Sequence, residues 1–181
     1  MEKTELYETF QKGLTSVNGE SYIAKKADVA ATLTKIFQDK DTHEVALVET
    51  PLLKEIGAVD ALKAAGIKVD PDHFRKNAPD DKGGVTEADY GIANLGSIVQ
   101  MKDDIDCRIV ETVSDVYVGI VKLSKIVDTF DDMIDIMAET KPFPKFAGII
   151  TGPSRTADIE CVGTVGVHGP RQYSVIVVED A

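Results

Sequence analysis

Apolar residues recur every three or four positions in the first part of the chain, which is the spacing of one face of a helix. Residues 3–17 carry such a stripe, and Asn18-Gly19 end it with turn chemistry. A second stripe runs over residues 25–38. The pattern therefore predicts two amphipathic helices, so that residues 1–40 form an N-terminal helical segment packed on the rest of the chain.

A shorter periodicity follows these two stripes. Residues 44–49 are apolar in the middle, as in a buried strand, and residues 67–69 form a second short apolar run. Between them, residues 52–65 have a helical pattern closed by Gly66, at the position where helices favour a left-handed residue. Strand, helix and strand in this order predict a βαβ unit and hence a parallel sheet.

The middle of the chain is less regular. Residues 70–84 are rich in Pro, Gly and Asp, which predicts a loop. Residues 86–89 have the pattern of a helix start, with the Thr86 hydroxyl as its cap. Residues 90–93 and 97–101 then read as two short strands, or as one turn of helix and a strand.

Four more elements complete the chain. Three runs of apolar and β-branched residues each predict a strand, and they cover residues 116–121, 146–150 and 173–178. The last two are expected to be core strands. Residues 128–137 predict an amphipathic helix with acids on its outer face. Consecutive helical residues diverge, so these acids indicate a solvated face rather than a metal site, and no metal is expected.

Two polar loops lie between the last two predicted strands. The first reads TGPSRTADIE over residues 151–160 and the second reads GVHGPR over residues 166–171. Their glycines let backbone N–H groups approach a ligand, and their side chains offer hydroxyls, guanidinium groups and an imidazole. These loops predict a cradle for a carboxylate or phosphate, although an ordinary connection made of turn residues explains the same composition.

Two chemical roles stay open for the acids of this region. Glu160 or Asp158, with His168, could polarise or deprotonate a small substrate, or could pair with Arg155 and shape the loop. Asp89 is a second candidate carboxylate, or an acid that complements a helix dipole. The candidate catalytic residues are Asp89, Glu160 and His168. The candidate ligand-binding residues are Thr86, Asn94, Thr151, Gly152, Ser154, Arg155, Thr156 and Gly169.

Composition narrows the partners. The chain has 181 residues with 43% apolar content, enough for one domain over residues 1–181 with a real core. Its formal charge of -11 argues against nucleic acid and anionic membranes. An anionic ligand therefore needs local positive charge, for which Arg155, Arg171 and His168 are candidates, and we expect Arg155 and His168 to converge on one concavity.

Two cysteines, Cys107 and Cys161, are too few for a disulfide framework or for the four ligands of an iron–sulfur cluster. Cys161 is expected to be a buried structural thiol. Neither a phosphate-binding loop nor a dinucleotide fingerprint occurs, so no cofactor is expected. Without a signal peptide or a long apolar run, the chain is expected to be cytoplasmic.

Two blocks of sequence resemble a known family. GPSRTADIE followed by GVHGPR, and GVTEADYGIANLGSIV over residues 84–99, resemble the signatures of the lactate utilisation (LUD) domain family. The resemblance implies an α/β fold with a three-layer, open, mostly parallel sheet flanked by helices, similar to the sugar-phosphate isomerases and CoA transferases. The subfamily that it resembles is the small subunit without iron–sulfur clusters in a multi-subunit lactate-oxidising system.

Two functions from different classes remain. In the first, the chain is an accessory or small-carboxylate-binding component of lactate oxidation to pyruvate, with iron–sulfur subunits as partners. In the second, it is a freestanding enzyme of the isomerase or CoA-transferase class, with Asp89 or Glu160 as base and a small phosphorylated or carboxylated anion as substrate. The low cysteine count favours the first, and homo-oligomerisation is open in both.

Overall fold

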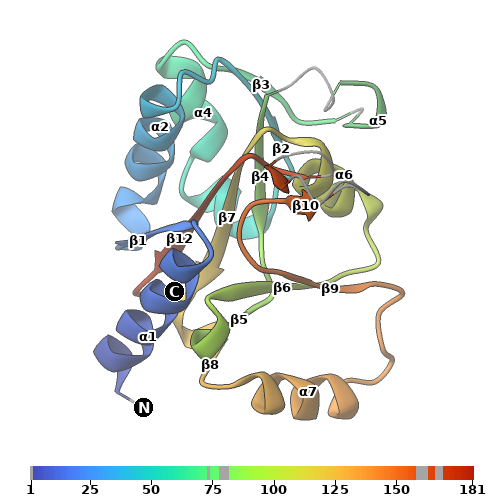
Figure 1. Ribbon diagram of the computed structural model, residues 1–181. Helices are drawn as coiled ribbons and strands as arrows, with labels where there is room; N and C mark the ends of the chain where they lie inside the picture. Colours follow the sequence, from blue (N-terminus) through green and yellow to red (C-terminus); the bar gives the residue numbers. More distant parts are fainter. Residues whose placement is uncertain (1, 73, 78–81, 158–162, 166–168) are drawn as a thin grey trace.

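The computed structural model describes residues 2–72, 74–77, 82–157, 163–165 and 169–181, and its centre is a six-stranded sheet (Figure 1). The strand order is β1-β12-β7-β4-β2-β3, and every neighbouring pair is parallel. The strands span Glu20–Ala24 (β1), Glu44–Leu47 (β2), Lys68–Asp70 (β3), Gly83–Glu87 (β4), Val116–Lys122 (β7) and Gln172–Val178 (β12). The predicted open, mostly parallel sheet is confirmed.

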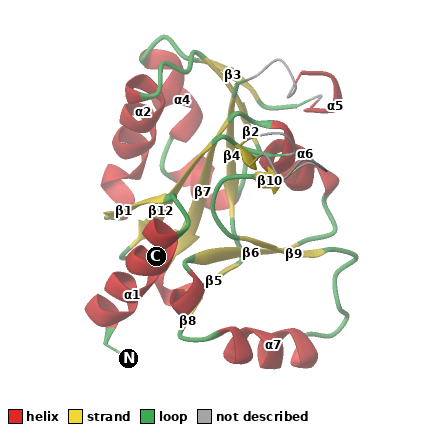
Figure 2. Cartoon of the chain, in the orientation of Figure 1, coloured by secondary structure: helices red, strands yellow, loops and turns green. Residues whose placement is uncertain are grey.

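Helices cover both faces of this sheet (Figure 2), because successive residues of its buried strands point to opposite sides. Val118 and Ile120 pack against one group of helices, whereas Tyr117 and Val121 pack against α1. The first group comprises α2 (Val29–Asp39), α3 (Pro51–Glu55) and α4 (Ala58–Ala64). The opposite face carries α1 (Lys3–Ser16) and α6 (Ile105–Val113). The sheet is therefore the middle of three layers.

A second, four-stranded sheet lies beside α1 and below the main sheet in the view of Figure 1. Its order is β8-β5-β6-β9, from strands Ile126–Val127 (β8), Tyr90–Ile92 (β5), Ser97–Met101 (β6) and Ala147–Ile150 (β9). α7 (Phe130–Glu139) packs against it through the buried Met133. The acids of α7 are exposed, as predicted, and they are Asp131, Asp132, Asp135 and Glu139.

The periodic segments were well predicted. The expected helices over residues 3–17 and 25–38 correspond to α1 and α2, since a regular apolar stripe specifies a helix. The strands expected at residues 44–49 and 67–69 are β2 and β3. The helix expected over residues 52–65 is divided at Gly57, where the backbone has φ 66°. Residues 1–40 also contain β1, which pairs with β12, so that this segment is part of the main sheet and not only helical.

Other expectations were wrong. Residues 86–89 do not begin a helix: Thr86 lies in β4, where its β-branched side chain suits a strand between two others and its hydroxyl is bonded by side chains instead of capping a turn. Residues 146–150 form the predicted strand, β9, but it is only partly buried instead of a core strand, and it pairs antiparallel with β6 in the second sheet. The expected loop over residues 70–84 includes the short helix α5 (Phe74–Asn77) and the first residues of β4.

Two glycines set the second sheet against α1. The 3₁₀ turn η2 (Ala93–Leu95) joins β5 to β6, and Gly96 follows it with φ 63°. A Cβ added to Gly96 would overlap the backbone nitrogen of Leu14, and one added to Gly13 would lie 2.6 Å from the Gly96 nitrogen. The two backbones are thus in direct contact, an approach that side chains would prevent. This contact fixes the position of β6, and with it that of β9.

In the part of the chain that the structure describes, no helix combines the length and the apolar character needed to cross a membrane.

Candidate functional site

A pocket of about 280 Å³ lies between α6 and the two loops that the sequence singled out. Four of the predicted ligand-binding residues line it: Thr151, Gly152, Ser154 and Gly169. Its remaining lining residues are Glu111, Thr112, Ile149, Ile150, Pro153 and Pro170. The structure thus brings together part of the first loop, the end of the second loop, and a helix that sequence reasoning did not consider.

Short contacts hold the first loop in place. The Ser154 backbone N–H donates to the Pro170 carbonyl at 2.8 Å, which joins the two loops. The hydroxyls of Thr151 and Ser97 share a hydrogen bond of 2.7 Å, which ties the loop to β6. Gly152 has φ 74°, and a Cβ there would lie 2.7 Å from the Val17 carbonyl oxygen at the end of α1. Gly152 is therefore required by conformation and by space.

Glu111 gives the pocket its distinctive chemistry. Glu111 is only 8% exposed although it carries a carboxyl group. Its Oε2 atom has no hydrogen-bond partner among the described residues. Burial raises the pKa of Glu111 to about 7, and the charges of Lys102 and Arg108 oppose that rise only in part. A carboxyl group that titrates near neutrality can donate or accept a proton in the pocket.

The sequence contained a signal for Glu111. It lies four residues after Cys107, so both project from one face of α6, and that face is buried. An acid on the apolar stripe of an amphipathic helix is an unusual placement that points to a satisfied pair or to a functional group. No element is predicted from sequence over residues 102–115, so Glu111 was not placed on a helix face.

A buried hydrogen-bond network lies next to the pocket and contains Thr86. The Thr86 and Tyr117 hydroxyls are 2.6 Å apart, and Gln100 Nε2 donates to Thr86 Oγ1 at 2.8 Å. Tyr117 stacks on Tyr173, with ring centroids 5.7 Å apart, and the Tyr173 hydroxyl donates to the Ile150 carbonyl at 3.4 Å. Thr86 is fully buried. It therefore supports the residues around the pocket and is not among those that line it.

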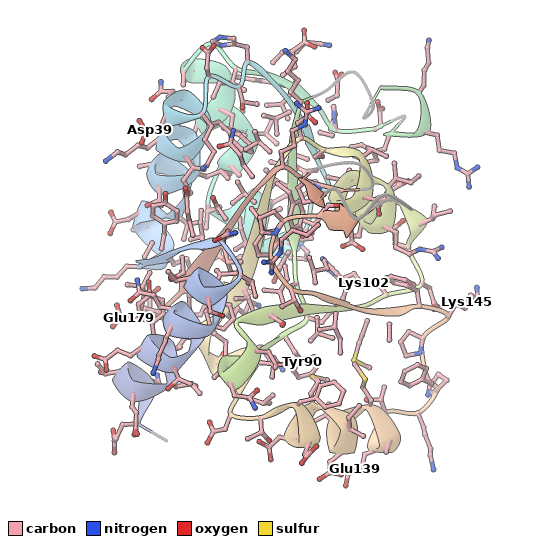
Figure 3. The ribbon with its side chains drawn as sticks, viewed as in Figure 1. Asp39, Tyr90, Lys102, Glu139, Lys145 and Glu179 are labelled. Atoms are coloured by element: carbon pink, nitrogen blue, oxygen red, sulfur yellow. The ribbon has the colours of Figure 1, made fainter. Side chains whose placement is uncertain are left out.

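Asp89 is engaged in a separate cluster of charges. Its Oδ2 accepts a hydrogen bond of 2.7 Å from the Met101 backbone, and its Oδ1 lies 3.8 Å from Lys102 Nζ. Lys102, which Figure 3 labels beside the second sheet, also donates to the Glu87 carbonyl. Burial raises the pKa of Asp89, which the Met101 hydrogen bond and Lys102 oppose. Asp89 is not among the residues that line the pocket, and its contacts join β6 to the start of β5.

The remaining candidates have different placements. Arg155 is exposed at the start of β10 (Arg155–Ala157), which pairs antiparallel with β11 (Gly163–Val165). Asn94 is exposed on η2, outside the pocket lining. Four residues of the two loops lie outside the described residues, namely Asp158, Glu160, Cys161 and His168. The side chain of Thr156 lies outside them as well. The convergence of Arg155 and His168 stays a prediction.

Arg171 has a defined partner. Its Nε lies 3.7 Å from Asp115 Oδ1, with both side chains largely exposed, and its backbone N–H donates to the Asp115 carbonyl at 2.8 Å. An exposed ion pair of this kind contributes little to stability. No group of three or more His, Cys, Asp or Glu side chains within the described residues is placed to hold a metal ion.

The three-layer fold and the pocket define an α/β protein with a small polar site beside its central sheet. The model of the LUD domain matches residues 7–178, and the chain belongs to the LUD domain family. The resemblance seen in the two sequence blocks is thereby confirmed.

Individual relatives agree with this assignment. The chain is similar to lactate utilization protein C of Macrococcus caseolyticus, with 39% identity over 101 residues that cover 54% of this chain and 44% of that protein. It is also similar to lactate utilization protein C of Halalkalibacterium halodurans, with 24% identity covering 97% of this chain and 80% of that protein. The chain thus spans less than half of the first relative and four-fifths of the second.

A solved structure supports the fold. The crystal structure of a DUF162 family protein from Deinococcus radiodurans superposes with a TM-score of 0.71 and 18% identity, covering 98% of this chain and 99% of that one. At this identity the likeness concerns the fold alone.

Proposed function

We propose that this chain is a small-carboxylate-binding component of lactate utilisation. The observation that carries the proposal is the pocket between α6 and the residues 151–154, which contains hydroxyl groups, a buried carboxyl group and apolar walls. Its volume of about 280 Å³ suits a metabolite of a few heavy atoms better than a nucleotide. The similarity to proteins named lactate utilization protein C supports lactate or pyruvate as the ligand.

The charge of the pocket is compatible with an anion. The whole chain carries a formal charge of -11, which repels anions at long range. Close to the pocket, the protonated form of Glu111 removes one negative charge, and Lys102 and Arg108 act electrostatically on the same carboxyl group. A small monocarboxylate therefore has a favourable local environment within an acidic protein.

The proposal places the redox chemistry in other subunits. Two cysteines cannot hold a four-thiolate cluster, so any iron–sulfur cluster of the lactate-oxidising system belongs to a partner subunit. In this view the chain binds a carboxylate and docks with those partners.

A second candidate function follows from Glu111 itself. Its pKa of about 7 is that of an efficient general acid or base at neutral pH. In this alternative the chain is a freestanding enzyme of the isomerase or CoA-transferase class, acting on a small phosphorylated or carboxylated anion, with Glu111 added to the candidate base Glu160.

Thermal unfolding with a panel of ligands separates the two functions. We expect L-lactate or pyruvate at 100 times its dissociation constant to add about 2.7 kcal/mol to the free energy of unfolding. Ser154→Ala should weaken this stabilisation, because Ser154 lines the pocket and the variant removes its hydroxyl. Ser124→Ala is the matched control, since the Ser124 hydroxyl bonds the Ala181 carbonyl outside the pocket lining.

The same panel includes sugar phosphates and CoA esters. Stabilisation by one of these, lost in Arg155→Ala, would favour the freestanding enzyme and contradict the accessory function. If no ligand raises the unfolding temperature while the chain co-purifies with iron–sulfur proteins, the enzyme function fails.

A further inference from the structure

Three buried side-chain atoms lack hydrogen-bond partners among the described residues: Gln100 Oε1, Arg108 Nε and Glu111 Oε2. An unpaired buried polar atom has lost its hydrogen bonds to water without replacement, so such atoms are rare in native proteins. Arg108 and Glu111 lie on α6 one turn apart, and Gln100 lies in β6 of the adjoining sheet. Of the three residues only Glu111 lines the pocket, so its carboxyl group is the one that a molecule bound there can reach.

Glu111 is the member of this set that lines the pocket. Its carboxyl group can accept a hydrogen bond when it is ionised and can donate one when it is protonated. A ligand carboxylate beside an ionised Glu111 would meet strong repulsion, because two carboxylates at hydrogen-bond distance do not both stay ionised. One shared proton converts that repulsion into a short, charge-assisted hydrogen bond.

We propose that Glu111 contacts the ligand directly, and that a small monocarboxylate binds in this pocket together with one proton shared between the Glu111 carboxyl group and a ligand carboxylate oxygen. The inference rests on the proposed carboxylate-binding function and makes it more specific. When Glu111 is already protonated, its own proton forms the shared hydrogen bond. Binding then neither takes up nor releases a proton. When Glu111 is ionised, binding takes one proton from solvent.

The charged and titratable groups around Glu111 are consistent with this assignment. Lys102, at the end of β6, and Arg108, on α6 itself, favour its ionised form, whereas burial opposes that form more strongly and sets the pKa at about 7. Tyr117 from β7, Tyr173 from β12 and Cys107 from α6 have pKa values raised by burial and stay neutral. Of the described lining residues, Glu111 is the one that titrates near neutrality.

The positive groups nearby are held in place. Lys102 is fixed by the Glu87 carbonyl and by Asp89, and the Arg108 guanidinium lies over the Phe146 ring at 4.7 Å from its centroid. They supply a constant field to the pocket. The pH dependence of ligand binding therefore follows Glu111.

Calorimetric titration with L-lactate and with pyruvate, in buffers of different ionisation enthalpy, measures the proton directly. At about pH 8 we expect uptake of roughly one proton per ligand, and at about pH 6 almost none, because the pKa lies between them. Above about pH 7 the affinity should fall roughly tenfold per pH unit. Lactamide, a neutral analogue whose amide can donate to ionised Glu111, should not show this loss.

In Glu111→Gln the side chain has the same size and gains a permanent N–H donor. The variant should therefore bind lactate without proton uptake and without pH dependence. Glu139→Gln, on the exposed face of α7, is the matched control and should behave as wild type. Infrared spectra of the wild-type protein without ligand give an independent measurement: a protonated-carboxyl band present at about pH 6 should disappear by about pH 8 and be missing from Glu111→Gln.

The outcomes are distinguishable. Lactate binding without proton uptake at about pH 8, equal in wild type and Glu111→Gln, would overturn the role of Glu111 and leave the proposed function standing. Absence of the titrating infrared band would overturn it even if the variant did not fold. Failure of both carboxylates to bind at any pH would contradict the proposed function itself.

Discussion

Replacing Gly96 with alanine should lower the free energy of unfolding by about 3–5 kcal/mol, which is the largest effect of a single methyl group that we expect in this protein. The added Cβ would overlap the Leu14 backbone in α1, and a backbone cannot move aside as a flexible side chain can. The residue would also have to keep φ 63°, a left-handed conformation unfavourable for alanine. Urea denaturation of the variant measures the loss.

Gly66→Ala is the matched control for this experiment. Gly66 also has a positive φ, of 80°, yet a Cβ there meets nothing within 4 Å. The control therefore contains the conformational strain without the steric overlap, and it should cost only about 1–2 kcal/mol. Equal losses in the two variants would show that α1 and η2 are not in the close contact described.

The stability of wild type relative to Glu111→Gln should fall by about 3 kcal/mol as the pH rises from about 4 to about 8. Folding raises the pKa of Glu111 from 4.5 to about 7, so the folded state binds the proton more tightly than the unfolded state. This contribution to stability is complete below about pH 4.5 and is lost as the pH rises through about 7. Glutamine does not titrate and lacks that dependence.

Urea denaturation at several pH values gives this difference directly, because all other titrating groups are common to the two proteins and cancel. Glu139→Gln serves again as control, since that side chain is exposed, and its curve should run parallel to wild type. Parallel curves for Glu111→Gln would mean that folding leaves the pKa of this carboxyl unchanged, which contradicts its burial without a partner among the described residues.

The sequence predicted those parts of the fold that depend on local periodicity. The stripe of α1, with Leu6, Phe10 and Leu14 buried, and the β-branched run of β12 each determine their own element. The sheet that a strand joins depends on distant partners. The run at residues 146–150 is apolar enough for either sheet, and only its antiparallel pairing with β6 decides the outcome. The helix start predicted at Thr86 was wrong because a hydroxyl residue followed by acids is common both at a helix N-cap and at the end of a strand.

The candidate site was predicted only in part, because its loops form local sequence patterns whereas the helix beside them is brought there by tertiary contacts. Glycine-rich polar loops are visible in sequence, and Thr151, Gly152, Ser154 and Gly169 do meet in one pocket. The opposite wall comes from α6, which packs there through tertiary contacts that no local motif encodes. Glu111 could have been inferred from its place on the buried face of that helix, but its unpaired oxygen could not.

The central claim is that a small carboxylate binds between α6 and the loop after β9. Nuclear magnetic resonance titration of the ¹⁵N-labelled protein with pyruvate and L-lactate tests it most directly. We expect saturable shifts concentrated at the backbone amides of Thr112, Gly152, Ser154 and Gly169. Saturable shifts confined instead to the hollow between α1, β1 and α2, around Tyr7 and Lys35, or no saturable shifts with either ligand, would contradict it.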